Sequence, residues 1–178
     1  MNDTELEACI HAYGKDLYSF LYQLTGNRQE ADDLYQDTFL KLLELDQRPD
    51  FTRNPKSWLL TIAVQLWKNR RRKYGWRQRI AGAPVSMDEP LSEIPSNEAS
   101  PEQQVISAEE AVLVREAVRR LPDRYRLPVV LFYMEELKIA EIGQILHIPQ
   151  GTVKSRLHQA KKILEKELEV AFDEKKHG

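Results

Sequence analysis

Cationic and aromatic side chains alternate along one stretch of the sequence, between Trp58 and Arg79. Residues 51–79 contain nine basic side chains and no acidic one. Cations of this kind follow the phosphates of a single strand while aromatic rings stack on its bases, and each stacked base adds roughly 1–3 kcal/mol. The block therefore predicts nucleic-acid binding, and the alternative is that its tryptophans are core residues and its arginines only solvated. The aromatic members are Trp58, Trp67, Tyr74 and Trp76.

A second stretch, residues 138–162, has the pattern of two short helices joined by a turn. Apolar residues recur at helical spacing in each helix and leave a polar outer face. The major groove of DNA admits one such helix, whose N-terminal side chains reach the base edges. Periodicity alone leaves DNA binding and an ordinary αα-hairpin equally open. The outer face of the second helix carries Lys154, Ser155, His158, Gln159, Lys161 and Lys162.

Glu30, Asp33 and Asp37 have the spacing of one helical face, which raises the question of a metal site. A di-metal carboxylate site also needs a Glu-x-x-His pair on a partner helix, and we identify none on the helices expected beside it. We therefore favour a solvated or partner-binding face and expect neither a metal nor a cofactor. Cys9 is the only cysteine, which excludes an internal disulfide, and no Cys–His arrangement supports a nucleophile.

The formal net charge of −2 hides an uneven distribution of charge along the 178 residues. The cationic block lies between two anionic segments, residues 1–50 and 80–114, and such asymmetry matters more for partners than the net charge does. No window is apolar over the length needed to cross a membrane, and the first residues lack the pattern of a signal peptide. We therefore expect a cytoplasmic protein.

Hydrophobic periodicity and capping signals predict an all-α fold of two small helical domains. Asn27 and Asn54 are expected N-caps, and Gly26 is expected to end the first helix. Residues 80–107 combine prolines, small residues and only acidic charges, which is typical of a flexible linker. The expected helices cover residues 5–24, 27–45, 54–74, 109–121, 122 onward, 138–146 and 150 onward. The expected domains are 1–79 and 108–178.

These segments, in this order, resemble bacterial RNA polymerase sigma factors of the sigma-70 family, of the extracytoplasmic-function (ECF, group 4) type. The resemblance covers nearly the whole chain, and its most specific part is the run IPQGTVKSRL at residues 148–157. Within the basic block the matching residues are Trp58, Leu59, Ile62, Ala63, Arg71 and Arg72. The departures are Gln65 in place of the usual Asn, Asn69 in place of Asp, Gly143 in place of Ala and His147 in place of Gly.

The resemblance implies a protein that directs core RNA polymerase to specific promoters and initiates transcription, and that is not itself an enzyme. Its partners would be the coiled coil and flap of the polymerase, promoter DNA that is double-stranded at −35 and single-stranded at −10, and an anti-sigma factor, often membrane-anchored. The regulon would be one of stress or envelope genes. Residues 1–79 would correspond to sigma region 2 and residues 108–178 to region 4, with the linker threading the RNA channel or acting as a disordered tether.

The resemblance also assigns residues to three surfaces. Contacts to the −35 element would come from Thr152, Lys154, Ser155, Arg156, His158, Gln159 and Lys162. Contacts to the −10 element would come from Trp58, Gln65, Lys68, Asn69, Arg71, Arg72 and Trp76. Core polymerase would bind Asp33, Leu34, Gln36, Asp37, Phe39 and Leu40, with Tyr35 and Phe39 as partly exposed aromatic anchors.

Two other classes of protein compete with this interpretation. A regulator that binds duplex DNA through residues 138–162 would bind specifically without polymerase and use its N-terminal half for dimerisation or sensing. A helical enzyme would need a cluster of catalytic groups, and the sequence shows no nucleophile–base pair or glycine-rich phosphate loop.

Overall fold

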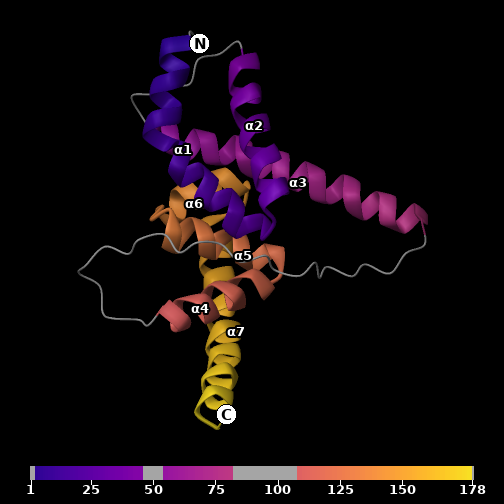
Figure 1. Ribbon diagram of the computed structural model, residues 1–178, viewed down its shortest axis with the longest axis vertical. Helices are drawn as coiled ribbons and strands as arrows, with labels where there is room; N and C mark the ends of the chain where they lie inside the picture. The colour runs from indigo at the N-terminus through magenta and orange to yellow at the C-terminus, as the bar shows by residue number, and fades with distance from the viewer. Residues whose placement is uncertain (1–2, 46–53, 82–107, 178) are drawn as a thin grey trace.

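The N-terminal half of the chain is a group of three helices. The structure, a computed structural model, describes residues 3–45, 54–81 and 108–177, and every element in these ranges is helical. The all-α expectation is confirmed for this part of the chain. In Figure 1 the third helix crosses the first two, and its C-terminal part projects away from them. The three helices are α1 (Asp3–Thr25), α2 (Arg28–Glu44) and α3 (Pro55–Ala81).

The C-terminal half consists of shorter helices arranged around the first part of one long helix (Figure 1). Pro128 lies inside the second of these helices and removes one backbone donor, and the helix continues directly into a wider π-helical turn. That turn ends at Met134, and the next residue, Glu135, contacts Lys56 of the N-terminal half. The elements are α4 (Ala108–Arg120), α5 (Asp123–Val129), the π-helix η1 (Val130–Met134), α6 (Ile139–Leu146) and α7 (Gln150–His177).

The local signals that start and end the N-terminal helices act as expected. The side chain of Asn27 accepts a hydrogen bond from the backbone N–H of Glu30 at 3.0 Å, and that of Asn54 accepts one from Ser57 at 3.1 Å. Gly26 has a φ of 66°, the left-handed conformation that ends α1. The expected end of α3 near residue 74 is wrong, because Gly75 continues the helix rather than capping it and α3 extends to Ala81. Apart from Ile80 and Ala81, the expected linker lies outside the described residues.

The turn between α6 and α7 confirms a helix-turn-helix. His147 adopts the left-handed conformation, with φ 56° and ψ 46°, as expected for a residue that replaces glycine there. The backbone N–H of Ile148 donates to the carbonyl of Gly143 at 3.0 Å, which brings the turn back over α6. A Cβ on Gly143 would lie 2.9 Å from the carbonyl oxygen of Ile148, so this position is restricted to glycine unless the turn shifts.

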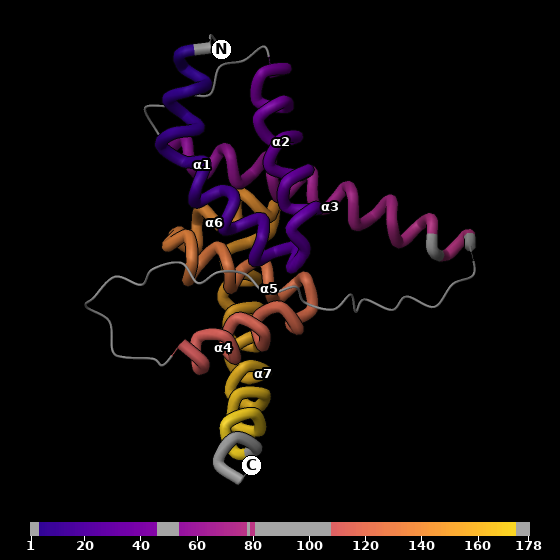
Figure 2. The backbone as a smooth tube through the Cα atoms, in the orientation of Figure 1, coloured from indigo at the N-terminus to yellow at the C-terminus, as the bar shows by residue number. Residues whose placement is uncertain are grey.

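The two halves pack directly against each other. Helix α3 packs on α6, and α1 packs on η1 and α4. The buried residues of both halves form one continuous hydrophobic cluster, which extends from Phe20 and Leu34 to Ile142 and Val153. Figure 2 shows α6 lying behind α1 and beside α3. Helix α3 therefore lies directly beside the first helix of the helix-turn-helix.

Candidate nucleic-acid and polymerase interface

The first turns of α7 present a polar face to solvent. Val153 and Ala160 are fully buried on the inner side and fix the orientation of the helix. Thr152 and Arg156 are half-buried, and the Ser155 hydroxyl donates to the carbonyl of Thr152 at 3.1 Å. The exposed members of the predicted −35 set lie at helical spacing on one face, as a helix that enters a groove requires. They are Lys154, Ser155, His158, Gln159 and Lys162.

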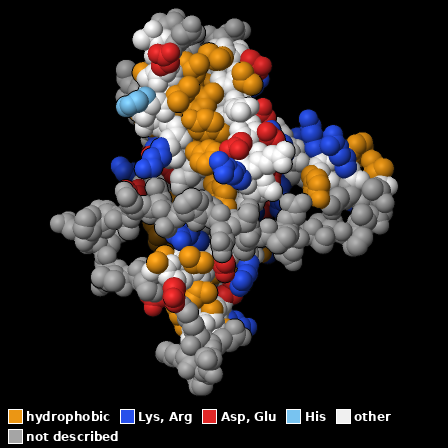
Figure 3. Space-filling view, viewed as in Figure 1, with side chains coloured by type: hydrophobic (Ala, Val, Ile, Leu, Met, Phe, Trp, Pro, Cys, Tyr) orange, Lys and Arg blue, Asp and Glu red, His pale blue; other side chains and the backbone are white. Residues whose placement is uncertain are grey.

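The predicted −10 set divides between different sides of α3. Trp58 is partly buried against the core. Asn69, Arg72 and Trp76 follow one another at i, i+3 and i+7 along a solvent-facing stripe, and Trp76 is 65% exposed. The Arg72 guanidinium donates to the side-chain oxygen of Asn69 at 3.0 Å. Figure 3 shows basic and hydrophobic side chains together on this projecting part of α3.

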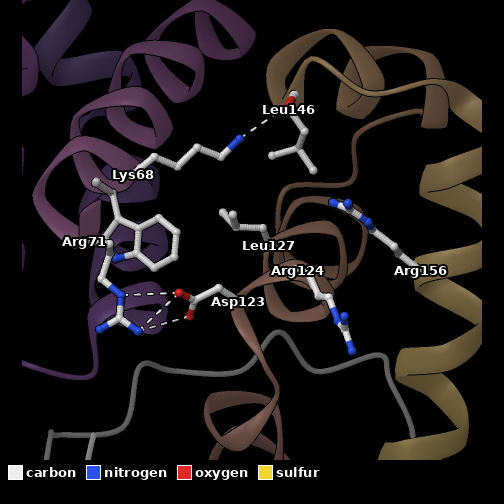
Figure 4. Close-up of a pocket in the computed structure, with 8 residues that line it drawn as sticks. Lys68, Arg71, Asp123, Arg124, Leu127, Leu146 and Arg156 are labelled. Carbon is white, nitrogen blue, oxygen red and sulfur yellow. Dashed lines mark hydrogen bonds and ion pairs between the residues drawn. The ribbon is translucent and has the colours of Figure 1, made fainter. Parts of the chain in front are cut away.

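The other three members of the −10 set contact the C-terminal half. The Gln65 amide lies 3.2 Å from Nε2 of His147, and the Lys68 ammonium donates to the carbonyl of Leu146 at 3.4 Å. The Arg71 guanidinium donates to the carboxylate of Asp123 through Nε at 3.3 Å and Nη2 at 3.2 Å. These three contacts fix α3 against the N-terminus of α5 and the C-terminus of α6, and Figure 4 shows those made by Lys68 and Arg71.

A cavity of about 260 Å³ lies between the halves, next to these contacts. Figure 4 shows that Lys68 and Arg71 enter it from α3, whereas Arg156 approaches from α7 on the opposite side. Burial, with a smaller contribution from the Arg156 charge, lowers the pKa of Lys68. The cavity is lined by Trp67, Lys68, Arg71, Asp123, Arg124, Leu127, Leu146 and Arg156. A region with four cations and one carboxylate attracts anions.

Trp67 is a core residue and not a base-stacking platform. It is 3% exposed, and the guanidinium groups of Arg71 and Arg126 lie 5.6 and 5.9 Å from the centre of its ring. The expectation that each aromatic residue of the basic block is available to bases is therefore wrong for Trp67. Arg126 also donates to Asp123 at 2.5 Å, and its burial lowers its pKa.

A buried ion pair lies at the other end of the contact between the halves. The Lys56 ammonium of α3 is 2.9 Å from Oε2 of Glu135 and 3.1 Å from Oδ2 of Asp16 in α1. Burial raises the pKa of Glu135, although Lys56 opposes this shift. Burial lowers the pKa of Lys56, but the two carboxylates more than offset this and raise it. Asn54 adds a hydrogen bond to Oε1 of Glu141 at 2.7 Å.

The predicted polymerase-binding residues of α2 do not all lie on its surface. Leu34 is fully buried and Phe39 is 6% exposed, so the expectation of Phe39 as a partly exposed anchor is wrong. Phe39 turns inward and packs edge-to-face on the half-buried Tyr35, with ring centres 5.0 Å apart. Leu40 is 58% exposed and Gln36 is exposed, which leaves them as the accessible members of the set together with Asp33 and the half-buried Asp37.

Sequence reasoning missed two features of this face. Arg70 of α3 lies 2.5 Å from Asp37 and 3.9 Å from Asp33, so a guanidinium is the positive charge that these two carboxylates face. Leu43 on α2 and Ile10 on α1 add further exposed apolar side chains, and Figure 3 shows a hydrophobic stripe along α1 and α2. The i+3 spacing of Leu40 and Leu43 was the available signal.

The structure gives no further support for a metal site or a membrane anchor in the part of the chain that it describes. Residues 3–45, 54–81 and 108–177 contain no group of three or more His, Cys, Asp or Glu side chains placed to hold a metal ion. Within the same ranges no helix is both long enough and apolar enough to cross a bilayer. Cys9 is buried, and burial raises its pKa.

The geometry defines a class of protein: a helical DNA-binding protein with a helix-turn-helix in one half and a cationic, aromatic helix in the other. The family description "Sigma-70 region 2" matches residues 9–77, and "Sigma-70, region 4" matches residues 111–164. The ECF RNA polymerase sigma factor SigW of Bacillus subtilis is 35% identical over 164 residues, covering 89% of this chain and 86% of that protein. The chain belongs to the family of ECF RNA polymerase sigma factors.

Other relatives agree with this assignment. The ECF RNA polymerase sigma factor SigE of Mycolicibacterium smegmatis is 30% identical over 155 residues, covering 87% of this chain and 58% of the relative. The fold resembles that of the sigma factor RpoE of Bartonella quintana, solved in complex with the anti-sigma factor NepR. That likeness has a TM-score of 0.66 at 24% identity and covers 94% of this chain and 96% of the other.

Proposed function

We propose that this sigma factor directs bacterial core RNA polymerase to specific promoters, with the work divided among the three surfaces described above. The exposed face of α7 reads the −35 element in duplex DNA. The stripe of Asn69, Arg72 and Trp76 on α3 takes part in opening the −10 element. The accessible face of α2 binds the polymerase. The chain catalyses no reaction itself, and the polymerase, in the cytoplasm, supplies the chemistry.

One observation carries the proposal: side chains suited to duplex and to single-stranded DNA lie on separate, exposed helical faces of one chain. The α7 face offers Ser155, His158 and Gln159, which form directional hydrogen bonds to base edges, beside Lys154 and Lys162 for phosphates. The α3 stripe offers an exposed indole next to a guanidinium, which suits an unpaired strand.

The proposal divides the chain at residues 80–107, with a region 2-like domain before this segment and a region 4-like domain after it. The two family matches, to residues 9–77 and 111–164, support that division. We further propose control by an anti-sigma factor, because the structurally similar RpoE is bound to one. A partner that covers the face of Leu40 would block polymerase binding directly.

In vitro transcription tests the proposal. Purified core polymerase is supplied with genomic fragments, with and without the chain, and the 5′ ends of the transcripts are mapped. New defined start sites that appear only with the chain support it, and their upstream sequences give both promoter elements. Specific footprints by the chain alone, without new start sites, would instead favour an independent DNA-binding regulator.

A further inference from the structure

The cavity of about 260 Å³ where α3 meets α5 and α7 is lined by cationic side chains from all three helices. Figure 4 shows Lys68 of α3 and Arg156 of α7 entering it from opposite sides. Arg71 and Arg124 complete the cationic set, and Asp123 is the one carboxylate among the lining residues. We propose that this cavity is a binding site for a small diphosphate-bearing anion, such as inorganic pyrophosphate. The inference goes beyond the proposed function and does not depend on it.

The cavity carries more positive charge than its own carboxylate neutralises. The Asp123 carboxylate already accepts from the Arg71 guanidinium at 3.2 Å. Within the ranges that the structure describes, no carboxylate forms an ion pair with Lys68, Arg124 or Arg156. Three cations that line one cavity are therefore left for a ligand to neutralise.

Lys68 is the cation for which an anionic ligand would matter most. Burial, with a smaller contribution from the Arg156 charge, lowers the pKa of Lys68, so the ammonium is both poorly hydrated and repelled by its neighbour. Its hydrogen bond to the carbonyl of Leu146 is long, at 3.4 Å. An anion between Lys68 and Arg156 would replace the repulsion with two attractions and supply charge-assisted hydrogen bonds to both groups.

Apolar side chains form the rest of the wall and strengthen this attraction. Leu127 and Leu146 are each 4% exposed, and Trp67 is 3% exposed. A cleft lined by charges of one sign with low-dielectric walls concentrates the electric field and attracts counter-ions. The volume also lies below the range of about 300–1,000 Å³ that is typical of drug-sized ligands, which favours a diphosphate over a ligand with a large organic part.

The charge of the site indicates two phosphate groups rather than one. Four cations against one carboxylate leave a formal net charge of +3 among the lining residues. One phosphate group carries about −1.5 to −2 at pH 7, so two groups are needed to match that charge. The placement of Lys68 and Arg156 on opposite walls suits the same ligand, because each cation can bind the oxygens of a different phosphate.

Phosphate groups also occur along a DNA strand, and Lys68, Arg71 and Arg156 belong to the predicted DNA-contacting sets. The experiment therefore compares pyrophosphate, orthophosphate and oligo(dT) as ligands of the full-length chain. Isothermal titration calorimetry measures affinity and stoichiometry at constant ionic strength and without divalent cations. Thermal unfolding with each ligand is the second measurement, because a ligand that binds the folded chain and not the unfolded chain raises Tm.

The site variant combines Lys68→Gln with Arg156→Gln, which removes the two opposed charges and keeps polar side chains. The matched control combines Lys73→Gln with Arg77→Gln, which removes one lysine and one arginine charge from exposed positions of α3 outside the cavity lining. Circular dichroism verifies that each variant is folded. Arg124→Gln alone, at an exposed position of the lining, serves as the site variant if the double substitution does not fold.

We expect the parent and the control to bind one pyrophosphate per chain, more tightly than orthophosphate, and to unfold at a higher temperature in its presence. The site variant should bind pyrophosphate at least about tenfold more weakly, since two charge-assisted contacts are lost. Equal pyrophosphate affinity in the site variant and the control would overturn the proposal, as would equal affinity of the parent for pyrophosphate and orthophosphate.

A parent chain that binds oligo(dT) but not pyrophosphate would also overturn the proposal and would assign these cations to DNA alone. The titrations contain neither polymerase nor promoter. Failure of the anion site is therefore distinguishable from failure of the proposed function, which the transcription assay measures.

Discussion

Arg70 of α3 and Asp37 of α2 are joined by an ion pair, with Nη2 2.5 Å from Oδ2. The pair links the helix assigned to polymerase binding with the helix assigned to DNA opening. Both side chains are partly exposed, so the pair adds no more than about 1 kcal/mol to stability. The pair matters for the choice of variants, because replacing Asp37 also removes the ion-pair partner of Arg70. The α2 surface is therefore better tested through an apolar residue.

Leu40 and its neighbour Phe39 should respond in opposite ways to truncation. Leu40→Ala removes an exposed side chain, so it should weaken binding to core polymerase and leave the free energy of unfolding nearly unchanged. Phe39→Ala should lower the free energy of unfolding by about 3–5 kcal/mol, because it empties a buried site beside Tyr35. Urea unfolding and surface plasmon resonance with immobilised core measure the two effects. Full polymerase affinity in Leu40→Ala would show that this face of α2 is not the contact.

Trp76 should be the most sensitive aromatic residue for single-strand binding. Its ring is exposed on the same stripe as Arg72, and loss of one stacked base costs roughly 1–3 kcal/mol of binding free energy. We expect Trp76→Ala to weaken binding of labelled oligo(dT) by that amount in fluorescence-anisotropy titrations. Tyr133→Ala is the control, since Tyr133 is equally exposed at 65% but lies on η1. Equal losses in both variants would rule out a specific role for the indole.

Two helical glycines near the helix-turn-helix should differ when each is replaced by alanine. Gly151 has no atom within 4 Å of the position of a Cβ, so Gly151→Ala should raise the free energy of unfolding by roughly 0.5–1 kcal/mol through helix propensity. Gly143→Ala should not give this gain, because its Cβ would lie 2.9 Å from the Ile148 carbonyl oxygen. Thermal and urea unfolding measure both changes. A gain at Gly143 as large as that at Gly151 would show that the turn relaxes freely.

The buried Glu135 predicts a dependence of stability on pH. Burial raises the pKa of Glu135 above its ordinary value of 4.5, so the folded state binds this proton more tightly than the unfolded state. Its contribution to stability is complete below pH 4.5 and is lost as the pH rises through the raised pKa. As the pH rises through that pKa, the free energy of unfolding of Glu135→Gln should fall less than that of wild type.

Urea unfolding at a series of pH values from 4.5 to neutrality measures this difference. Glu136→Gln is the control, because it makes the same substitution at the neighbouring residue, whose side chain is exposed. Its profile should parallel that of wild type, since the other carboxyl groups are unchanged. Parallel profiles for all three proteins would contradict the assignment of the raised pKa to Glu135.

The sequence predicts the fold well because its strongest signals are local. Asn27 and Asn54 cap their helices, and His147 takes the left-handed conformation, through contacts within a few residues. The burial of Phe39 and the exposure of Leu40 depend on how α2 rotates against α1 and α3, which helical periodicity fixes only approximately. Gly75 also carries a local signal, but a weak one, because glycine is found both inside and at the ends of helices.

The candidate site is less predictable because long-range packing decides which side chains are free. Trp67 and Trp76 have the same basic neighbourhood in the sequence, yet one is buried between two arginines and the other is exposed. Arg71 and Arg72 are adjacent, but Arg71 binds Asp123, which is 52 residues away, while Arg72 lies on the exposed stripe. No pattern within one helix distinguishes these residues, since the difference comes from the other half of the chain.

The division of labour between α7 and α3 is the central claim, and footprinting of a polymerase–promoter complex tests it most directly. On a promoter mapped with this chain and core polymerase, DNase protection reports the −35 contact and permanganate reactivity of thymines reports opening at −10. Ser155→Ala with His158→Ala should reduce the upstream protection, whereas Arg72→Ala with Trp76→Ala should keep it and lose permanganate reactivity. Two results would contradict the account. One is an α7 variant that keeps upstream protection but loses permanganate reactivity, and the other is an α3 variant that keeps full permanganate reactivity.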